Sequence, residues 1–385
     1  MRVVHRLPLI AAGIALCLAG TASAAAGRPA AGPAPAASGL VVGVTHTQTT
    51  FFGGDPNDPA APPAVKRAGQ VLEQVGPLQV VPIMGWGLDN PEPSPGAYDW
   101  QGLDDRMALV RGTGGTPVIT LCCAPDWMKG GKPGETDWDK LEVAPLPAHY
   151  QDFANLAAAV ARRYPDVRYF QVWNELKGFW DDQDNRWAYE NYTALYNDVY
   201  DAVKAATPDA KVGGPYAPMG IRSDDTFSQE YHIHGSWGWL DDRPLDAVRY
   251  WNNHKHGGDF AVVDGGEALD DTGRSSTDAA VAAQPLAAAT SWVAQTTGLP
   301  VWWAEFYVQA DNIARSAWPK RVTALLSALN TAGARAALLW APECDTSSAS
   351  TSDGPCLWTS TQDETNGGKA TSYLPLITPY RGLPG

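Results

Sequence analysis

Short apolar runs rich in β-branched residues recur along the chain, and amphipathic stretches separate them. This alternation is typical of βα units packed around a parallel sheet. Eight candidate strands follow from the pattern: Leu40–Val44, Gln79–Met84, Thr116–Leu121, Val167–Trp173, Ala210–Gly214, Leu245–Tyr250, Pro300–Ala304 and Ala336–Trp340.

Helices are predicted between these runs. The segment Pro147–Arg163 places Phe153, Leu156 and Val160 at helical spacing, and Tyr164-Pro165 ends the run. Three further stretches carry a comparable pattern: Tyr189–Ala206, Thr277–Thr296 and Trp318–Thr331. Two segments rich in turn residues and aromatics are predicted to be long loops on one face of the fold: Leu88–Trp100 and Ser223–Asp242.

The number of strands favours a closed barrel over an open doubly wound sheet. An open sheet of the nucleotide-binding kind would carry a Gly-rich turn after its first strand, and no GxGxxG follows residues 41–44. We therefore predict an α/β fold, a single (β/α)8 TIM barrel, over residues 39–385. In such a barrel the catalytic residues lie at the C-terminal ends of the strands.

The N-terminus has the pattern of a secretory signal. Arg2, His5 and Arg6 precede an apolar run to Leu18, and the small residues of 22–24 suit a cleavage site. Residues 1–24 are thus predicted to be removed on export, and residues 25–38, almost entirely Ala, Pro and Gly, to form a linker. The apolar run is too short for a membrane span. We expect a secreted, extracellular protein with no membrane attachment after cleavage.

Charge and composition narrow the possible partners. The formal net charge is −14, and the 28 Lys and Arg residues are scattered without runs, which argues against nucleic-acid binding. The chain has 16 Trp and 14 Tyr. Each carries a polar group that needs a partner, so we expect some of them to line a surface cleft rather than the core.

Four cysteines follow the signal segment. Cys344 and Cys356 flank a polar loop and are predicted to form a disulfide. Cys122 and Cys123 are adjacent at the end of a candidate strand. Because adjacent cysteines rarely bridge each other, we expect them to be small buried residues.

Two glutamates stand at the ends of candidate strands four and seven. Glu175 ends the run that begins at Tyr169, and Glu305 ends the run that begins at Val301. These strands lie nearly opposite one another across a barrel mouth. Retaining hydrolysis of a glycosidic bond needs one carboxylic acid that protonates the leaving oxygen and one carboxylate that attacks the anomeric carbon. Trp173 and Trp303 would wall this pair, and Asn174 would bind the sugar 2-hydroxyl.

Trp173-Asn174-Glu175 and Trp303-Ala304-Glu305 resemble clan A glycoside hydrolases, and family 39 is the nearest match. Three further segments agree: residues 90–100, Pro125-Asp126-Trp127-Met128, and the run from Glu175 to Trp180. The likeness covers most of residues 40–345. It implies a barrel, a two-step retaining mechanism, Glu175 as general acid/base and Glu305 as nucleophile.

The chain departs from the clan pattern at two strands. Met84-Gly85-Trp86 stands where an Arg commonly supports the nucleophile, and Trp251 and Asn253 replace the His and Tyr usual on strand six. We therefore expect either Tyr250 or His254 to hydrogen-bond the nucleophile. The remaining candidates for substrate binding are His46, Trp127, Trp180, Trp340 and Glu343.

Other chemistries find little support. Neither His232-Ile233-His234 nor residues 55–58 have the ligand spacing of a recognised metal site, and no Gly-x-Ser-x-Gly occurs at a strand end. No metal and no cofactor are expected. The sequence predicts a hydrolase of plant or microbial cell-wall glycans, with β-xylosidase-like exo action preferred over endo cleavage. The alternative class is a non-catalytic carbohydrate-binding barrel.

Overall fold

A computed structural model describes residues 39–48, 50–51, 61–308, 310–344 and 355–382. All of these described residues belong to one compact unit. The predicted signal segment 1–24, the linker 25–38 and the acidic residues at 55–58 lie outside the described residues.

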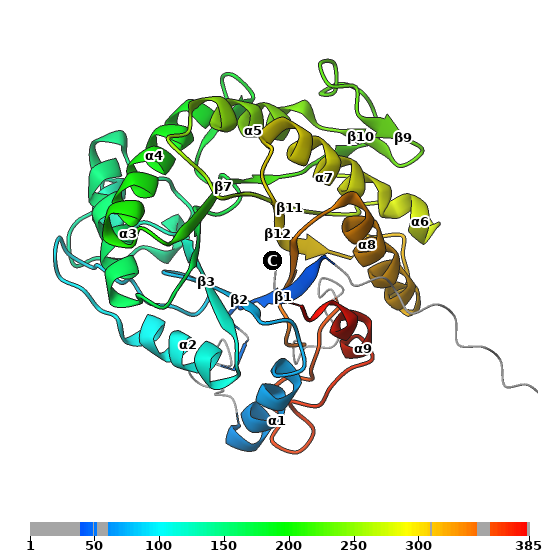
Figure 1. The fold of residues 1–385 in the computed structure, drawn as a ribbon, viewed down its shortest axis with the longest axis horizontal. Coiled ribbons are helices and arrows are strands. Elements are labelled where there is room, and N and C mark those ends of the chain that lie inside the picture. The colour runs from blue at the N-terminus through cyan, green and yellow to red at the C-terminus, as the bar shows by residue number, and fades with distance from the viewer. Residues whose placement is uncertain (1–38, 49, 52–60, 309, 345–354, 383–385) are drawn as a thin grey trace, which may run out of the picture. The chain divides into compact units, whose positions relative to one another are not determined.

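Eight parallel strands close into a barrel in the order β1-β13-β12-β11-β7-β4-β3-β2 (Figure 1). The predicted (β/α)8 TIM barrel is thus confirmed. The barrel strands are β1 Val41–Thr45, β2 Leu78–Pro82, β3 Thr116–Leu121, β4 Tyr169–Val172, β7 Lys211–Pro218, β11 Phe260–Gly266, β12 Val301–Tyr307 and β13 Ala336–Trp340.

Helices surround the barrel (Figure 1). They are α1 Pro62–Leu72, α2 Gln101–Gly112, α3 Tyr150–Arg163, α4 Tyr189–Ala206, α5 Asp242–His254, α6 Ala279–Ala282, α7 Gln284–Thr297, α8 Trp318–Ala332 and α9 Leu374–Ile377. After β13 the chain returns toward α1, where Arg67 donates to the carbonyls of Glu364 and Gly367. The four predicted helices correspond to α3, α4, the α6–α7 pair and α8.

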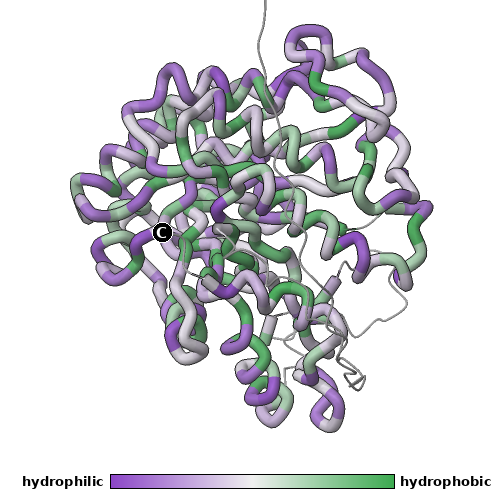
Figure 2. Tube along the Cα trace, turned by 45° about the vertical axis from the view of Figure 1, so that its right-hand side comes forward, coloured by the Kyte–Doolittle hydropathy of each residue, from purple (hydrophilic) through white to green (hydrophobic). Residues whose placement is uncertain are grey.

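Strand side chains alternate between two buried layers because successive residues of a strand point to opposite faces. Val41, Val80 and Trp302 belong to the cluster inside the barrel. Their neighbours Val42 and Val81 belong to the larger cluster between the barrel and the helices. The hydrophobic segments in Figure 2 accordingly concentrate in the interior, and hydrophilic segments gather on outer turns.

Two small antiparallel sheets interrupt the connections after β4 and β7. One pairs β5 Trp180–Asp181 with β6 Arg186–Trp187. The other joins β8 Ile221–Arg222, β9 His234–Gly235 and β10 Gly238–Leu240. β9 and β10 lie inside the segment predicted as the loop 223–242, and β8 directly precedes it. The predicted loop 88–100 contains only isolated bridges.

The predicted sixth strand, Leu245–Tyr250, is wrong. These residues lie in α5, where Leu245, Val248 and Trp251 are buried at helical spacing and Asp241 caps the N-terminus by accepting from the Arg243 N–H. The sixth strand is β11, whose run Phe260–Val263 is wholly buried and follows Gly257-Gly258. A short continuous apolar run therefore indicated the buried strand better than a run with polar residues at every third or fourth place.

Both cysteine pairs are bridged in the structure. Cys344 and Cys356 form the predicted disulfide. Cys122 and Cys123 are buried, as expected, but they are also joined to each other, so the prediction that they do not bridge is wrong. The bridge lies just after β3, on the wall of the barrel that faces the helices.

In the part of the chain that the structure describes, every helix is too short or too polar to cross a lipid bilayer.

Candidate active site

The C-terminal ends of the barrel strands surround a cavity at the mouth. Its lining includes four of the residues predicted from sequence: His46, Asn174, Glu305 and Trp340. Glu175 lies beside it, because one carboxylate oxygen of Glu175 is within 4.8 Å of one of Glu305. The two glutamates that the sequence placed at the ends of distant strands are thus brought together.

Glu175 is presented by a tight turn after β4. Trp173, Glu175 and Leu176 all have left-handed backbone, with φ of 69°, 50° and 55°. A non-glycine residue in this conformation destabilises the fold by roughly 1–3 kcal/mol. Trp173 and Leu176 are fully buried, and burial of a large apolar side chain stabilises the fold by about 1.5–3 kcal/mol, which offsets the strain. The two buried side chains hold the turn, and the carboxylate between them faces the mouth.

A β-bulge directs Glu305 into the mouth. The pairing of β12 with β13 shifts register between Trp303 and Phe306. Since side chains alternate along a regular strand, an extra residue re-aims its neighbours. Ala304 faces the barrel interior and Phe306 the helix layer, and Glu305 between them reaches the cavity with only 2% of its surface exposed.

Two tyrosines hold Glu305. The Tyr216 hydroxyl donates to Oε1 at 2.5 Å, and the Tyr307 hydroxyl donates to Oε2. Tyr216 also has left-handed backbone, at a register shift between β7 and β11. Burial and then the charge of Glu175 raise the pKa of Glu305 to about 8, and the hydrogen bonds from the two tyrosines partly offset that rise. These donors favour the ionised form that a nucleophile needs.

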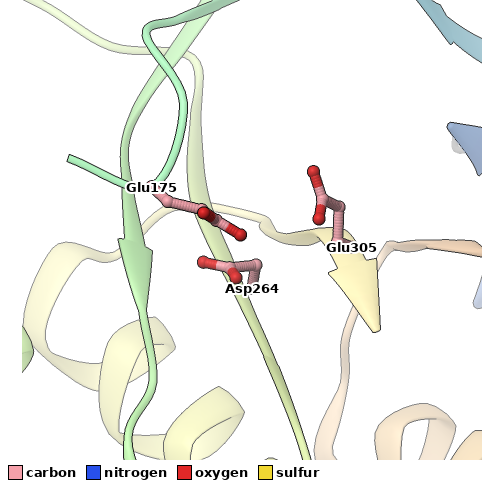
Figure 3. Close-up of side chains that lie close together, drawn as sticks. All are labelled: Glu175, Asp264 and Glu305. Carbon is pink, nitrogen blue, oxygen red and sulfur yellow. The ribbon is translucent and has the colours of Figure 1, made fainter. Parts of the chain in front are cut away.

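Asp264 is a third carboxylate at this site. It ends the buried run of β11, is paired in register with Glu305 of β12, and is 3% exposed. One oxygen each of Glu175, Asp264 and Glu305 lies within 4.8 Å of the others. In Figure 3 the carboxylates of Glu175 and Asp264 point toward one another, with Glu305 across from them.

Lys177 supplies a positive charge. Its Nζ lies 2.8 Å from Oε2 of Glu175 and 2.6 Å from Oε1 of Glu142. The ammonium group also lies 5.6 Å from the centre of the Trp86 ring. This lysine anchors the acid/base candidate and reduces the net negative charge of the three carboxylates.

The three carboxylates are also a group that could hold a metal ion. Both oxygens of Glu305, however, already accept from the tyrosine hydroxyls, and Oε2 of Glu175 already binds Lys177. A hard cation would need these oxygens as ligands. The donor pattern therefore fits a proton-handling site better than a cation site.

The opposite side of the cavity is neutral. His46 is buried, its Nε2 lies 3.0 Å from Oε1 of Gln79, and its Nδ1 has no partner in the part of the chain that the structure describes. Burial, and then the charge of Arg106, lower the pKa of His46 to about 3, so its imidazole is uncharged. Trp340 and Trp86 meet edge to face, with ring centroids 6.5 Å apart.

Three tryptophans predicted near the substrate turn away from it. Trp303 is fully buried against α7, where its N–H donates to the Thr290 hydroxyl, and Trp173 packs on α3. Trp127 is 9% exposed and donates its N–H to the Glu92 carbonyl. Alternation along β12 explains Trp303, because its neighbours on both sides face the barrel interior. Trp173 follows the end of β4, and its left-handed backbone turns the ring into the helix layer.

Two further predicted site residues serve other purposes. Tyr250 lies in α5, where it packs on Tyr189 and stacks on His254, so neither it nor His254 supports the nucleophile. Glu343 is buried, and both of its carboxylate oxygens accept hydrogen bonds from the returning C-terminal segment and from the loop after β1. Its donors are the backbone N–H of Phe51, the indole N–H of Trp358, and the N–H and hydroxyl of Thr361.

Trp180 is exposed on the outer hairpin β5–β6. Its ring is 39% exposed, meets Trp187 edge to face, and has the Arg243 guanidinium 5.2 Å from its centre. It therefore stays a candidate stacking surface.

Sequence reasoning missed five residues of the site: Trp86, Lys177, Tyr216, Asp264 and Tyr307. Two of them carried a usable signal. Tyr307 follows Glu305 by two residues, and Asp264 ends the apolar run of β11 in the same way that Glu305 ends its own. The misplaced sixth strand hid Asp264.

Solved structures share this fold. A hyperthermophilic β-glucosidase mutant matches with a TM-score of 0.62 at 12% identity, over 89% of this chain and 99% of that one. A monomeric β-xylosidase from Caulobacter crescentus CB15 matches with a TM-score of 0.58 at 16% identity, over 90% of this chain and 68% of that one. Xylanase B from Clostridium stercorarium F9 matches with a TM-score of 0.56 at 15% identity, over 88% of this chain and 96% of that one. Identities this low establish the fold alone. No protein-family model and no curated protein sequence matches the chain.

Proposed function

We propose that this chain is a retaining O-glycoside hydrolase of plant or microbial cell-wall glycans, with Glu175 as general acid/base and Glu305 as nucleophile. One observation carries the proposal: oxygens of the two glutamates lie within 4.8 Å of each other at the barrel mouth. Retaining enzymes hold their carboxyl groups about 5–5.5 Å apart, and inverting enzymes leave about 6.5–9.5 Å for a water molecule. The close spacing favours double displacement.

In the first step an oxygen of Glu305 bonds to the anomeric carbon while the bond from that carbon to the leaving oxygen breaks. The electron pair goes to the leaving oxygen, which takes a proton from Glu175. In the second step Glu175 accepts a proton from water, whose oxygen displaces Glu305. The hydroxyls of Tyr216 and Tyr307 fix the attacking carboxylate before the reaction, so little reorganisation is needed.

The neutral side of the cavity suits a sugar ring. With the Nε2–H tautomer donating to Gln79, Nδ1 of His46 is free to accept from a sugar hydroxyl. Asn174 offers amide groups next to Glu175, and Trp340 and Trp86 offer aromatic faces. A β-xylosidase-like exo action is our preferred specificity, and endo cleavage is the alternative. The N-terminal signal pattern supports secretion.

The test is hydrolysis of a panel of aryl glycosides and cell-wall polysaccharides by the protein and its Glu175→Ala and Glu305→Ala variants. Sugar release by the unaltered protein alone is the expected result, and the sugars released distinguish exo from endo action. Binding of glycans without turnover by any form would instead identify a carbohydrate-binding barrel.

A further inference from the structure

Glu175 lies beside a cation, which is a difficult setting for a general acid. The Lys177 ammonium is 2.8 Å from its Oε2. A cation at this distance favours the ionised carboxylate, whereas the first step of the proposed reaction needs a proton on this group. Some other feature of the site must therefore keep a proton here.

Asp264 occupies the position from which it can do so. It is 3% exposed, and its carboxylate points at that of Glu175 (Figure 3). Phe260 and Val262 of β11 face the barrel interior, so the alternation of strand side chains turns Asp264 the same way. It ends the buried run of this strand, and the register shift in the pairing with β12 sets it beside Glu305.

The donors around Asp264 are bound elsewhere. The titratable groups facing it are Glu175 and Lys177 after β4, Tyr216 of β7, and Glu305 and Tyr307 of β12. Both tyrosine hydroxyls donate to Glu305, and the lysine ammonium binds Glu175 and Glu142. Oδ1 of Asp264 has no hydrogen-bond partner in the described part of the chain.

An ionised carboxylate that is buried without a partner is strongly disfavoured, whereas one proton between two facing carboxyl groups satisfies both. We propose that Asp264 is a positioning residue that shares one proton with Glu175 and thereby keeps the acid/base group protonated despite Lys177. This inference rests on the proposed hydrolase function.

The electrostatics support this arrangement. Burial, and then the charges of Glu175 and Glu305, raise the pKa of Asp264, and hydrogen bonding with Glu175 raises it further, whereas Lys177 lowers it. Burial and the charges of Glu305 and Asp264 also raise the pKa of the Tyr307 hydroxyl, so the tyrosine stays a donor.

The shared proton keeps the charge of the site constant through the cycle. In the form of the site that reacts, Glu305 is ionised and the Glu175–Asp264 pair carries one negative charge. When the pair gives its proton to the leaving oxygen it becomes doubly negative, but Glu305 loses its charge at the same moment by forming an ester. Water then returns a proton to the pair as the ester is cleaved. Lys177 faces the pair while it is doubly charged.

The test is the pH dependence of kcat/KM for Asp264→Asn, which keeps the shape of the side chain but cannot share an acidic proton. We expect the basic limb of the profile to move down by about one pH unit or more, because Lys177 then favours ionised Glu175 unopposed. At pH 8, glycosides with poor leaving groups should lose on the order of tenfold more activity than activated aryl glycosides.

A matched control is Asp270→Asn in the segment after β11, where burial first, and then the charge of Asp241, raise the pKa of Asp270 to about 6. Its pH profile should coincide with that of the unaltered protein. If the basic limb of the pH profile does not move in Asp264→Asn, whether or not kcat falls, Asp264 has a purely structural role. If a chelator or added Mg²⁺ moves the basic limb of the unaltered protein, the site binds a metal and the proposal is overturned.

Infrared difference spectroscopy separates this inference from the proposed function. A protonated carboxyl band that titrates in the unaltered protein should be altered in Asp264→Asn whether or not any glycoside is cleaved. If Asp264→Asn alters the band but the unaltered protein turns over no substrate, the hydrolase proposal is wrong and the shared-proton proposal is supported. If the unaltered protein turns over substrate but Asp264→Asn leaves the band unchanged, only the shared-proton proposal is wrong.

Discussion

The two sides of the barrel mouth differ in charge and in how they are built. On the side formed by β4, β7, β11 and β12, three carboxylates lie close together, two tyrosine hydroxyls bind one of them and a lysine binds another. On the side formed by β1, β2 and β13, the cavity presents an uncharged histidine and two tryptophans. In the mechanism we propose, the first side makes and breaks bonds and the second holds the sugar ring, so changes on the two sides should alter different kinetic constants.

The backbone differs as well. Register shifts occur on both sides of β11 and between β12 and β13, and left-handed residues present Glu175 and Tyr216. Strained backbone concentrates at functional sites, where the surrounding packing compensates for it. Left-handed residues also lie on the neutral side, at Trp86 and Ala341, so the register shifts are the backbone feature that distinguishes the side with the carboxylates.

The largest expected effect is that of Glu305→Ala. Loss of the nucleophile should lower kcat on the order of 10⁴-fold or more, while circular dichroism and the melting temperature show an intact fold. Added azide should restore part of the activity toward activated aryl glycosides by attacking in place of the carboxylate. Undiminished hydrolysis in this variant would contradict the assignment.

The second largest effect is expected for Glu175→Ala. We expect a loss of about 10²–10⁴-fold for glycosides with poor leaving groups, and a much smaller loss for activated aryl glycosides, since only the former need protonation. The ratio of the two losses is the measurement. Equal losses would point to a different acid.

Tyr216→Phe and Tyr307→Phe should each lower kcat about 10²- to 10³-fold, as loss of one preorganised donor does. Each hydroxyl lowers the pKa of Glu305, so its removal raises that pKa and shifts the acidic limb of the pH–rate profile to higher pH. Tyr196→Phe is the matched control, because its hydroxyl donates to the Gly257 carbonyl behind the barrel. An acidic limb that moves equally in all three variants would refute this role.

The smallest effect is expected on the neutral side. Trp340→Ala should raise KM about tenfold, which corresponds to the loss of one aromatic contact, with little change in kcat for a saturating substrate. Trp303→Phe, which alters a buried ring facing α7, should lower the melting temperature and leave KM unchanged. If both variants changed KM alike, the division between the two sides of the mouth would lose its support.

Sequence reasoning captured what depends on pattern and strand order. The barrel, seven of its strands, and the glutamates after β4 and within β12 follow from apolar periodicity and the position of strand ends. Asp264 was missed because an amphipathic helix, α5, was read as the sixth strand. Trp303 and Glu343 were misassigned because alternation and the return of the C-terminal segment decide where those side chains point.

Tyr216 shows a second limit. It follows Pro215 in the middle of β7, and only a register shift against β11 brings its hydroxyl to Glu305. Bulges leave little trace in a single sequence, since they depend on the pairing of two strands.

The central claim is that Glu305 forms a covalent bond to the sugar. We would incubate the protein with an activated aryl glycoside carrying a fluorine at the sugar 2-position, which slows the second step, and map the product by peptide mass spectrometry. The account predicts one added glycosyl group on the peptide that contains Glu305, and none in Glu305→Ala. Turnover of ordinary substrate with inverted anomeric configuration and no adduct would contradict it.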